Sequence, residues 1–357
     1  MTKPMIPAML SFQGHSLSDD EKRLFRRYNP VGFNLFGRNI KNKSQLKKLI
    51  NEIKELLERD DILFAIDQEG GRVRRLAEPE FRPYLPQYAF GDLYLKNKKE
   101  ALDMAKKHAC LISGDLREIG FNMNYAPVLD LAQEYTSPAL KSRCFGSDEK
   151  IVSILGKTMI NEYIKRCISP CIKHLPGHGR ASVDPHLRLP IINTPLKELE
   201  KDFYPFIKNN NSPSGMTAHI VIPEIDDKLP ITQSRKDIDY IIRGIIGFDG
   251  FLISDAIDMK ALKGTIGEKT KASLQAGCDA VCYALGKFEE LIEICDNCSI
   301  INDKSQSRFE KIKSIVGKVP NFKNIKDISQ KYEEKAGGIE LYNDSYDATE
   351  VLNKLRG

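Results

Sequence analysis

Short apolar runs alternate with longer amphipathic segments along most of this chain. Eight of the runs are typical of buried β-strands, and they cover residues 8–12, 32–36, 62–66, 122–126, 169–172, 215–218, 251–254 and 280–283. Between them, apolar residues recur every three or four positions, which predicts helices, for example over residues 44–57, 101–119, 151–166, 196–207 and 237–246. The chain is therefore expected to repeat a strand–helix unit.

Local signals mark the ends of two predicted helices. Ser44 has the side chain of a helix N-cap and precedes the apolar positions that begin at Leu46. Gly120 stands where a glycine would end a helix just before the next strand. We expect helix boundaries at Ser44 and Gly120.

Strands that alternate with helices pair in parallel, because each helix carries the chain back across the sheet. Eight such units in 357 residues predict an α/β fold, a single (β/α)8 barrel of the TIM type. A doubly wound open sheet is the alternative. The barrel is favoured because polar residues follow one strand after another, and barrels of this type build their active sites at the C-terminal ends of the strands. These polar residues are Arg38, Asp67, Asp130, Lys173, His174, His219 and Asp255.

The sequence indicates one domain. No internal repeat, low-complexity tract or domain-sized linker interrupts residues 1–320, which we assign to the barrel. After Pro320 the chain has many Lys and Glu residues and few large apolar ones. We therefore expect residues 321–357 to form a C-terminal extension that packs on the barrel or trails from it.

Composition and charge point to a cytoplasmic protein without a nucleic-acid or membrane partner. The net charge of +5 is spread along the chain with no concentrated basic motif, and no apolar run approaches the length of a membrane span. The N-terminal apolar run is too short and too interrupted by proline for a signal peptide. Most of the eight cysteines lie in apolar segments, as buried thiols do in a reducing compartment. Cys295 and Cys298 form a lone CxxC pair with no second ligand pair near it, so we expect no metal there.

Residues 173–186 hold the densest group of chemically active side chains. This Gly- and Pro-containing segment follows a predicted strand and contains one lysine, three of the six histidines and one aspartate. Asp184 and His186 are separated by one residue, so in an extended segment their side chains point the same way. A carboxylate beside an imidazole fixes its tautomer and raises its basicity, as in hydrolase triads. The alternative is a metal site made of His174, His178, Asp184 and His186, although their spacing matches no familiar zinc pattern.

Other candidate residues follow three further strands. Asp255 ends an apolar run, where a rigidly held and partly desolvated carboxylate suits a nucleophile or a charge stabiliser; a helix N-cap is its alternative role. Asp67 ends another run and can accept hydrogen bonds from substrate hydroxyls, while Arg75 can hold a polar or anionic group. Arg143 lies on a loop beside Phe145, where it is either a substrate contact or a solvated side chain.

Five motifs occur in the order found in one enzyme family. They are IDQEGGRV at residues 66–73, RCFGSD at 143–148, KHLPGHG at 173–179, DPH at 184–186 and SD at 254–255. With them the chain resembles the bacterial β-N-acetylglucosaminidases of glycoside hydrolase family 3, of the peptidoglycan-recycling type. The resemblance extends from about residue 4 to beyond residue 280, and it too implies a (β/α)8 barrel.

The resemblance implies a reaction and the residues that perform it. Family members remove terminal β-linked N-acetylglucosamine with retention of configuration, through a covalent glycosyl–enzyme intermediate. Asp255 matches the nucleophile, His186 the general acid/base and Asp184 its dyad partner. No cofactor or metal is implied, and we expect a monomer that acts on N-acetylglucosaminyl muropeptides. The positions that bind the sugar and its neighbour are matched by Asp67, Arg75, Arg143, Lys173 and His174.

The chain departs from the family at two places. Pro185 stands between Asp184 and His186 where a small polar residue is usual, and it restricts the backbone there. Ala256 and Ile257 follow the strand-end aspartate where more polar residues are common. Neither change alters a reacting atom.

Several other functions stay open from the sequence. Within the family they are a β-glucosidase, which usually has a further domain carrying a glutamate acid/base, and a phosphorylase, in which phosphate replaces water. Outside it they are a catalytically silent sugar-binding barrel and a metal-dependent barrel hydrolase. The aglycone is also open among anhydromuramyl peptides, chitin oligosaccharides and other muropeptides.

Overall fold

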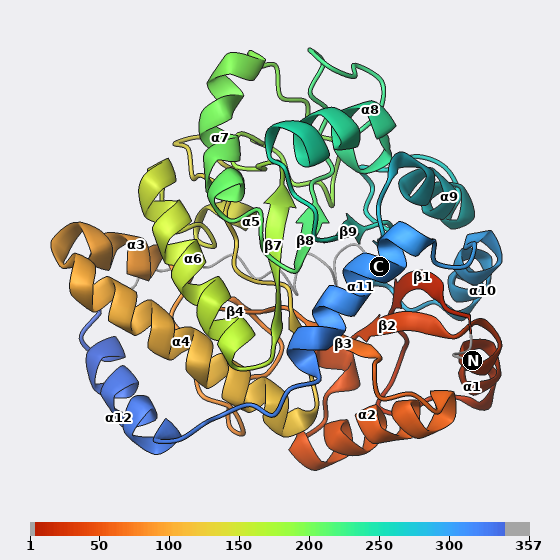
Figure 1. Ribbon diagram of the computed structural model, residues 1–357, viewed down its shortest axis with the longest axis horizontal. Coiled ribbons are helices and arrows are strands. Elements are labelled where there is room, and N and C mark those ends of the chain that lie inside the picture. Colours follow the sequence, from red (N-terminus) through yellow and green to blue (C-terminus); the bar gives the residue numbers. More distant parts are fainter. Residues whose placement is uncertain (1–3, 340–357) are drawn as a thin grey trace.

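Eight parallel strands close into a barrel in the computed structural model, which describes residues 4–339 (Figure 1). The strands follow the order β1-β10-β9-β8-β7-β6-β3-β2, and Ala8 of β1 pairs with Val281 of β10 to close the circle. They are β1 (Ile6–Leu10), β2 (Pro30–Asn34), β3 (Leu63–Ile66), β6 (Met123–Asn124), β7 (Ser169–Leu175), β8 (Ser214–Thr217), β9 (Phe251–Ala256) and β10 (Ala280–Cys282). Each overlaps one predicted run, so the (β/α)8 barrel is confirmed and the open sheet is excluded.

Helices connect the strands and surround the barrel (Figure 1). The longer ones are α1 (Asp19–Tyr28), α2 (Lys43–Leu57), α3 (Gln87–Lys96), α4 (Lys98–Ile119), α6 (Glu149–Lys165), α7 (Leu196–Lys208), η3 (Ile238–Ile245), α9 (Ile266–Ala276), α10 (Phe288–Asn297), α11 (Asp303–Val316) and α12 (Ile325–Ala336). Short helices are η1 (Gly37–Asn39), α5 (Pro138–Lys141), η2 (Ile231–Gln233) and α8 (Arg235–Asp237). An antiparallel pair, β4 (Gln68–Gly70) and β5 (Val73–Arg74), follows β3 as a small separate sheet.

Three local expectations have different outcomes. Gly120 ends α4 in the left-handed conformation, with φ +113°, as predicted. The predicted N-cap Ser44 is wrong: the Asn42 side chain caps α2, since its Oδ1 accepts a hydrogen bond of 2.8 Å from the Gln45 N–H. The helix predicted over residues 237–246 is mostly the π-helix η3, whose wider turn a 3.6-residue period does not reveal.

The N-terminal end of the barrel is closed by apolar packing. Along β3 and β9, alternate residues such as Leu63 and Ile253 face the interior, while their neighbours face the helices. Phe309 and Ile312 of α11 are fully buried in the same interior cluster, and α11 lies across the barrel in Figure 1. The opposite end, where the strands finish, is left for a binding site.

The C-terminal extension packs on the barrel as far as it is described. Helix α12 lies beside α4 (Figure 1), and its Tyr332 is 1% exposed. Residues 340–357 lie outside the described residues, and the division of the chain at residue 320 stays a prediction. Within residues 4–339, no helix is both long enough and apolar enough to cross a membrane.

Candidate active site

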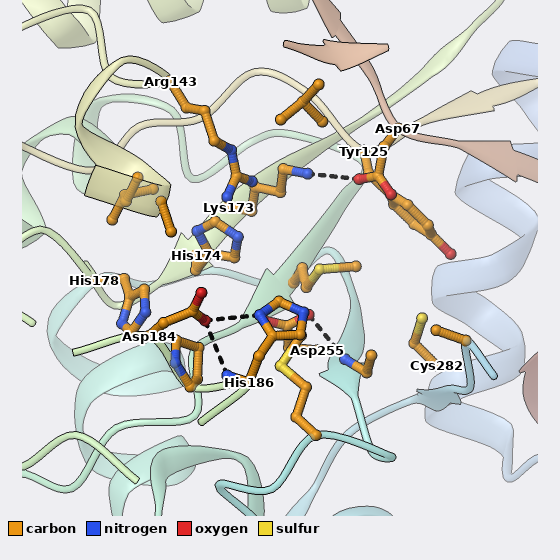
Figure 2. Close-up of a pocket in the computed structure, with 18 of the residues that line it drawn as sticks. Asp67, Tyr125, Arg143, Lys173, His174, His178, Asp184, His186, Asp255 and Cys282 are labelled. Carbon is orange, nitrogen blue, oxygen red and sulfur yellow. Dashed lines mark hydrogen bonds and ion pairs between the residues drawn. The ribbon is translucent and has the colours of Figure 1, made fainter. Parts of the chain in front are cut away.

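All eight residues that were assigned a catalytic or sugar-binding role from the sequence line one pocket, and Figure 2 labels seven of them, all but Arg75. The pocket lies at the C-terminal end of the barrel, where parallel strands bring together residues that are far apart in the chain. Strand ends supply four of them directly, and the loops after β5, α5 and β7 supply the others. They are Asp67, Arg75, Arg143, Lys173, His174, Asp184, His186 and Asp255.

One wall of the pocket is a network of carboxylates and cations. Lys173 Nζ lies 2.8 Å from Asp67 Oδ1 and 2.7 Å from Glu69 Oε1. Arg143 holds the Glu69 carboxylate with two bonds, from Nε to Oε2 at 2.9 Å and from Nη2 to Oε1 at 2.8 Å. Arg75 Nη2 lies 3.4 Å from Asp67 Oδ2. Each carboxylate of this network is shared by two cations, so the substitution of Asp67 or Glu69 takes an ion-pair partner from two cations at once.

The charged groups of this wall shift one another's pKa values. Burial raises the pKa of the Asp67 carboxyl, but the Lys173 and Arg75 cations outweigh burial and hold that pKa below its usual value. Burial likewise raises the pKa of Glu69, and Arg143 and Lys173 bring it down to about 2. For Lys173, burial lowers the pKa while Asp67 and Glu69 raise it, and the net effect is upward. These groups are charged at neutral pH and offer oriented donors and acceptors to a polar ligand.

His174 is oriented by a buried aspartate. Its Nδ1 lies 2.7 Å from Asp130 Oδ2, and the backbone N–H groups of His174 and His178 also donate to the Asp130 carboxylate. Burial raises the pKa of Asp130, but His174 outweighs burial and the net shift is downward. The ionised Asp130 therefore keeps a proton on His174 Nδ1, and Nε2 is the nitrogen left for the pocket.

His178 also lines the pocket. Burial lowers its pKa to about 4, so the imidazole is neutral at pH 7. Its Nδ1 is buried and has no hydrogen-bond partner among the described residues. Within residues 4–339, no three His, Cys, Asp or Glu side chains are arranged to hold a metal ion.

The Asp255 carboxylate is held at the end of β9. Its Oδ1 accepts a hydrogen bond of 2.8 Å from the Ala256 N–H, and its own N–H donates to Thr217 Oγ1 at 3.3 Å. Burial raises the pKa of Asp255, but the nearby imidazoles, His219 first, outweigh it and the net shift is downward. The alternative that Asp255 caps a helix is wrong, because it lies within β9 and Thr265 caps the next helix, α9.

Asp184 and His186 form a hydrogen-bonded pair on the loop after β7. His186 Nδ1 lies 2.7 Å from Asp184 Oδ1, which also accepts the backbone N–H of His186 at 2.9 Å. Burial lowers the pKa of His186, but Asp184 outweighs burial, Asp255 adds to its effect, and the net shift is upward. In Figure 2 the ring extends from Asp184 toward Asp255. The Pro185 carbonyl accepts a hydrogen bond from the Ala261 N–H at 3.1 Å, which attaches this loop to the segment after β9.

Four polar residues that build the pocket were given no role from the sequence: Glu69, Asp130, His219 and Asp258. Three had a visible signal, since Glu69 lies inside a recognised motif and Asp130 and His219 follow predicted strands. Burial lowers the pKa of His219, and its ring bridges Thr232 Oγ1 and the Ala256 carbonyl behind Asp255. Their function lies in contacts with residues remote in sequence, which a strand-end position does not reveal.

Comparison with known proteins assigns the family. A model of the glycosyl hydrolase family 3 N-terminal domain matches residues 6–315. The chain belongs to glycoside hydrolase family 3. Two relatives named beta-hexosaminidase are a Bordetella avium protein, 32% identical over 298 residues (81% of this chain, 84% of the relative), and a Tolumonas auensis protein, 34% identical over 281 residues (77% and 81%).

Solved structures of the family have the same fold. NagZ from Neisseria gonorrhoeae, in complex with N-trifluoroacetyl-D-glucosamine, has a TM-score of 0.83 and 29% identity, and the match covers 93% of this chain and 98% of that chain. The β-N-acetylglucosaminidase from Thermotoga maritima has a TM-score of 0.70 and 27% identity, with 91% and 69% covered. The predicted relationship to the bacterial family-3 β-N-acetylglucosaminidases and the predicted glycoside hydrolase class are confirmed.

Proposed function

We propose that this family-3 enzyme, a β-N-acetylhexosaminidase, removes terminal β-linked N-acetylglucosamine with retention of configuration. The proposed substrates are N-acetylglucosaminyl muropeptides derived from peptidoglycan, and no cofactor takes part. The observation that carries the proposal is the Asp184–His186 pair in one pocket with the Asp255 carboxylate. A retaining glycosidase needs a nucleophile and a proton-transfer group at one site.

In the first step, Asp255 attacks the anomeric carbon and forms a glycosyl ester. The bond to the leaving oxygen breaks, its electron pair stays on that oxygen, and protonated His186 supplies the proton from Nε2. Asp184 stays ionised and stabilises the imidazolium through its 2.7 Å contact with Nδ1.

In the second step, the neutral His186 Nε2 takes a proton from water, which attacks the anomeric carbon and expels the Asp255 carboxylate. The two displacements invert the anomeric carbon twice, so the configuration is retained. An imidazole in this role places no second anion beside Asp255, and the nucleophile stays ionised without like-charge repulsion.

The charged wall is the proposed sugar-binding surface. Asp67 accepts from sugar hydroxyls, and Lys173, His174 and Arg143 donate to the hydroxyls or to the N-acetyl carbonyl. Arg75 lies at the same wall with its guanidinium 5.5 Å above the ring of Phe36, and we assign it to the neighbouring sugar. The solved complex of NagZ with N-trifluoroacetyl-D-glucosamine supports an N-acetylated sugar as ligand.

The decisive variant is Asp255→Ala, assayed on an aryl β-N-acetylglucosaminide beside the matching β-glucoside. We expect wild type to cleave the N-acetyl sugar and the variant to lose at least about 1000-fold in kcat, because the covalent route is gone. Azide, a small anion that can occupy the vacated space, is expected to restore turnover and give the glycosyl azide of opposite configuration. The exposed Asp227→Ala is the matched control and should keep full activity. A fully active Asp255→Ala enzyme would contradict the assignment.

Phosphorolysis is the second candidate, because a neutral imidazole does not repel an incoming phosphate as a carboxylate would. The same assay with added phosphate distinguishes the two reactions, since a phosphorylase yields the sugar 1-phosphate. Turnover that EDTA abolishes would instead support the metal-dependent alternative. We also propose a cytoplasmic monomer, in keeping with the free cysteines, most of which are buried.

A further inference from the structure

A buried chain of hydrogen bonds joins the C-terminal helix α12 to the charged wall of the pocket. The Tyr332 hydroxyl of α12 lies 3.0 Å from Nδ1 of His108 on α4. His108 Nε2 lies 3.1 Å from the backbone carbonyl oxygen of Glu69. The Glu69 carboxylate in turn binds Arg143 and Lys173. Tyr332, His108 and Glu69 are each no more than 2% exposed.

The direction of each hydrogen bond in this chain follows from protonation. Burial lowers the pKa of His108 to about 4, so its imidazole is neutral. A carbonyl oxygen only accepts, and His108 Nε2 therefore carries the proton and donates to Glu69. Nδ1 is left with a lone pair and accepts the Tyr332 O–H, because burial raises the pKa of that phenol and keeps it protonated. The Tyr332 hydroxyl thus donates to Nδ1 and supports the tautomer in which His108 Nε2 donates to Glu69.

Tyr332 also holds a second support of the same backbone. The Leu85 N–H donates to the Tyr332 hydroxyl oxygen at 3.0 Å. A Cβ placed on Gly70 would lie 2.2 Å from the Leu85 carbonyl oxygen and 3.0 Å from His108 Cε1. The backbone next to Glu69 therefore rests directly on Leu85 and His108, and one hydroxyl binds both of them.

We propose that Tyr332 is a positioning residue of the active site, whose hydroxyl fixes the backbone at Glu69 and thereby orients Arg143 and Lys173 toward the sugar. The inference rests on the proposed function, which makes Arg143 and Lys173 sugar-binding groups. The matched family domain ends at residue 315, and α12 begins at Ile325. Helix α12 lies outside that match. It is connected to the pocket through the Tyr332–His108 and His108–Glu69 hydrogen bonds and then through the ion pairs of Glu69 with Arg143 and Lys173.

Tyr332→Phe tests this role because it removes one oxygen and keeps the ring. We expect KM for an aryl β-N-acetylglucosaminide to rise about tenfold while kcat changes less than about twofold, since Asp255 and His186 belong to other elements. Tyr84→Phe is the matched control. The Tyr84 ring lies 6.2 Å from that of Tyr332, and its hydroxyl binds Asp115 at 2.5 Å without reaching Glu69. The melting temperature of Tyr84→Phe is expected to fall by about as much as that of Tyr332→Phe, while its KM stays at the wild-type value.

A double-mutant cycle separates this link from general loosening. His108→Gln breaks the chain at its second member, and we expect the Tyr332→Phe/His108→Gln double variant to raise KM no more than either single change. Wild-type KM in Tyr332→Phe, or effects that multiply in the double variant, would overturn the proposal. If Tyr332→Phe does not fold, the KM of His108→Gln decides it. A wild-type enzyme that turns over no N-acetylglucosaminide would overturn the proposed function, and this inference with it.

Discussion

Oδ1 of Asp184 makes two hydrogen bonds with His186, one to the backbone N–H and one to Nδ1. The negative charge of this carboxylate sets the pH range in which the imidazole is protonated and can act as an acid. Asp184 raises the pKa of His186 against the effect of burial, so the imidazolium persists to higher pH. The pKa of Asp255 shifts in the opposite direction. The surrounding imidazoles lower it against the effect of burial, so the carboxylate stays ionised to lower pH. Between the two pKa values both groups are in the state that the first step needs, which gives a bell-shaped pH profile.

Asp184→Asn is expected to move the basic limb of this profile to lower pH. The amide carries no charge, so the pKa of His186 falls and the acid is lost earlier as pH rises. The measurement is kcat/KM against pH for an alkyl β-N-acetylglucosaminide, whose poor leaving group requires protonation. Asp258 raises the same pKa more weakly, so Asp258→Asn should give a smaller shift in the same direction. A basic limb that stays in place in Asp184→Asn would contradict the proposed dyad.

At the level of single helices, the end of α4 packs against α2 at a position where only a small residue is tolerated. Helix α4 carries His108 and ends at Gly120, whose positive φ of 113° is unfavourable for any residue with a Cβ. A Cβ at Gly120 would also lie 3.1 Å from Ile50 Cγ2 on α2. The sequence revealed this position, because a glycine directly before a strand is a recognisable helix stop.

Gly120→Ala is expected to lower the free energy of unfolding by about 1–2 kcal/mol, from backbone strain and the contact with Ile50. Gly120 lies away from the pocket, so kcat/KM should stay at the wild-type value. Chemical denaturation and the aryl-glycoside assay measure the two quantities. Gly37→Ala is the control, since nothing lies within 4 Å of a Cβ at Gly37. Equal stability of Gly120→Ala and wild type would show that α4 can end without the left-handed residue.

For the whole molecule, the two ends of the barrel differ in chemistry. The N-terminal end is sealed with apolar residues by α11, and the C-terminal end holds buried charges. The stability of that charged end depends on pH. Glu69 has a pKa of about 2 in the folded protein against 4.5 for a free side chain. Its contribution is therefore complete above pH 4.5 and is lost as pH falls toward 2.

Glu69→Gln is expected to lower the free energy of unfolding by about 3 kcal/mol at pH 7, because Lys173 and Arg143 lose a buried partner. The difference from wild type should shrink below pH 4.5 and nearly vanish near pH 2, where Glu69 itself takes up its proton. Denaturant titrations at several pH values measure it, with the exposed Glu55→Gln as the control. A pH-independent difference would mean that packing rather than charge holds Glu69.

The sequence by itself determined the repeating strand–helix order, the barrel and eight of the residues that line the pocket. Each of these depends on local information: hydrophobic period, strand ends and short motifs. The same local reasoning failed at Ser44, where Asn42 is the cap, and it had no means to recognise a π-helix at residues 238–245.

Only the tertiary structure decided how the pocket is held together. Lys173 binds Asp67 across 106 positions of sequence, and His108 binds Tyr332 across 224. Such pairs depend on how the strands and helices close in space, and nothing in the neighbourhood of either residue encodes its partner. Composition after Pro320 left open whether the extension packs on the barrel or trails from it. The burial of Tyr332, its bond to His108 of α4 and the packing of Ile325 and Ile328 against the core show that α12 packs on it.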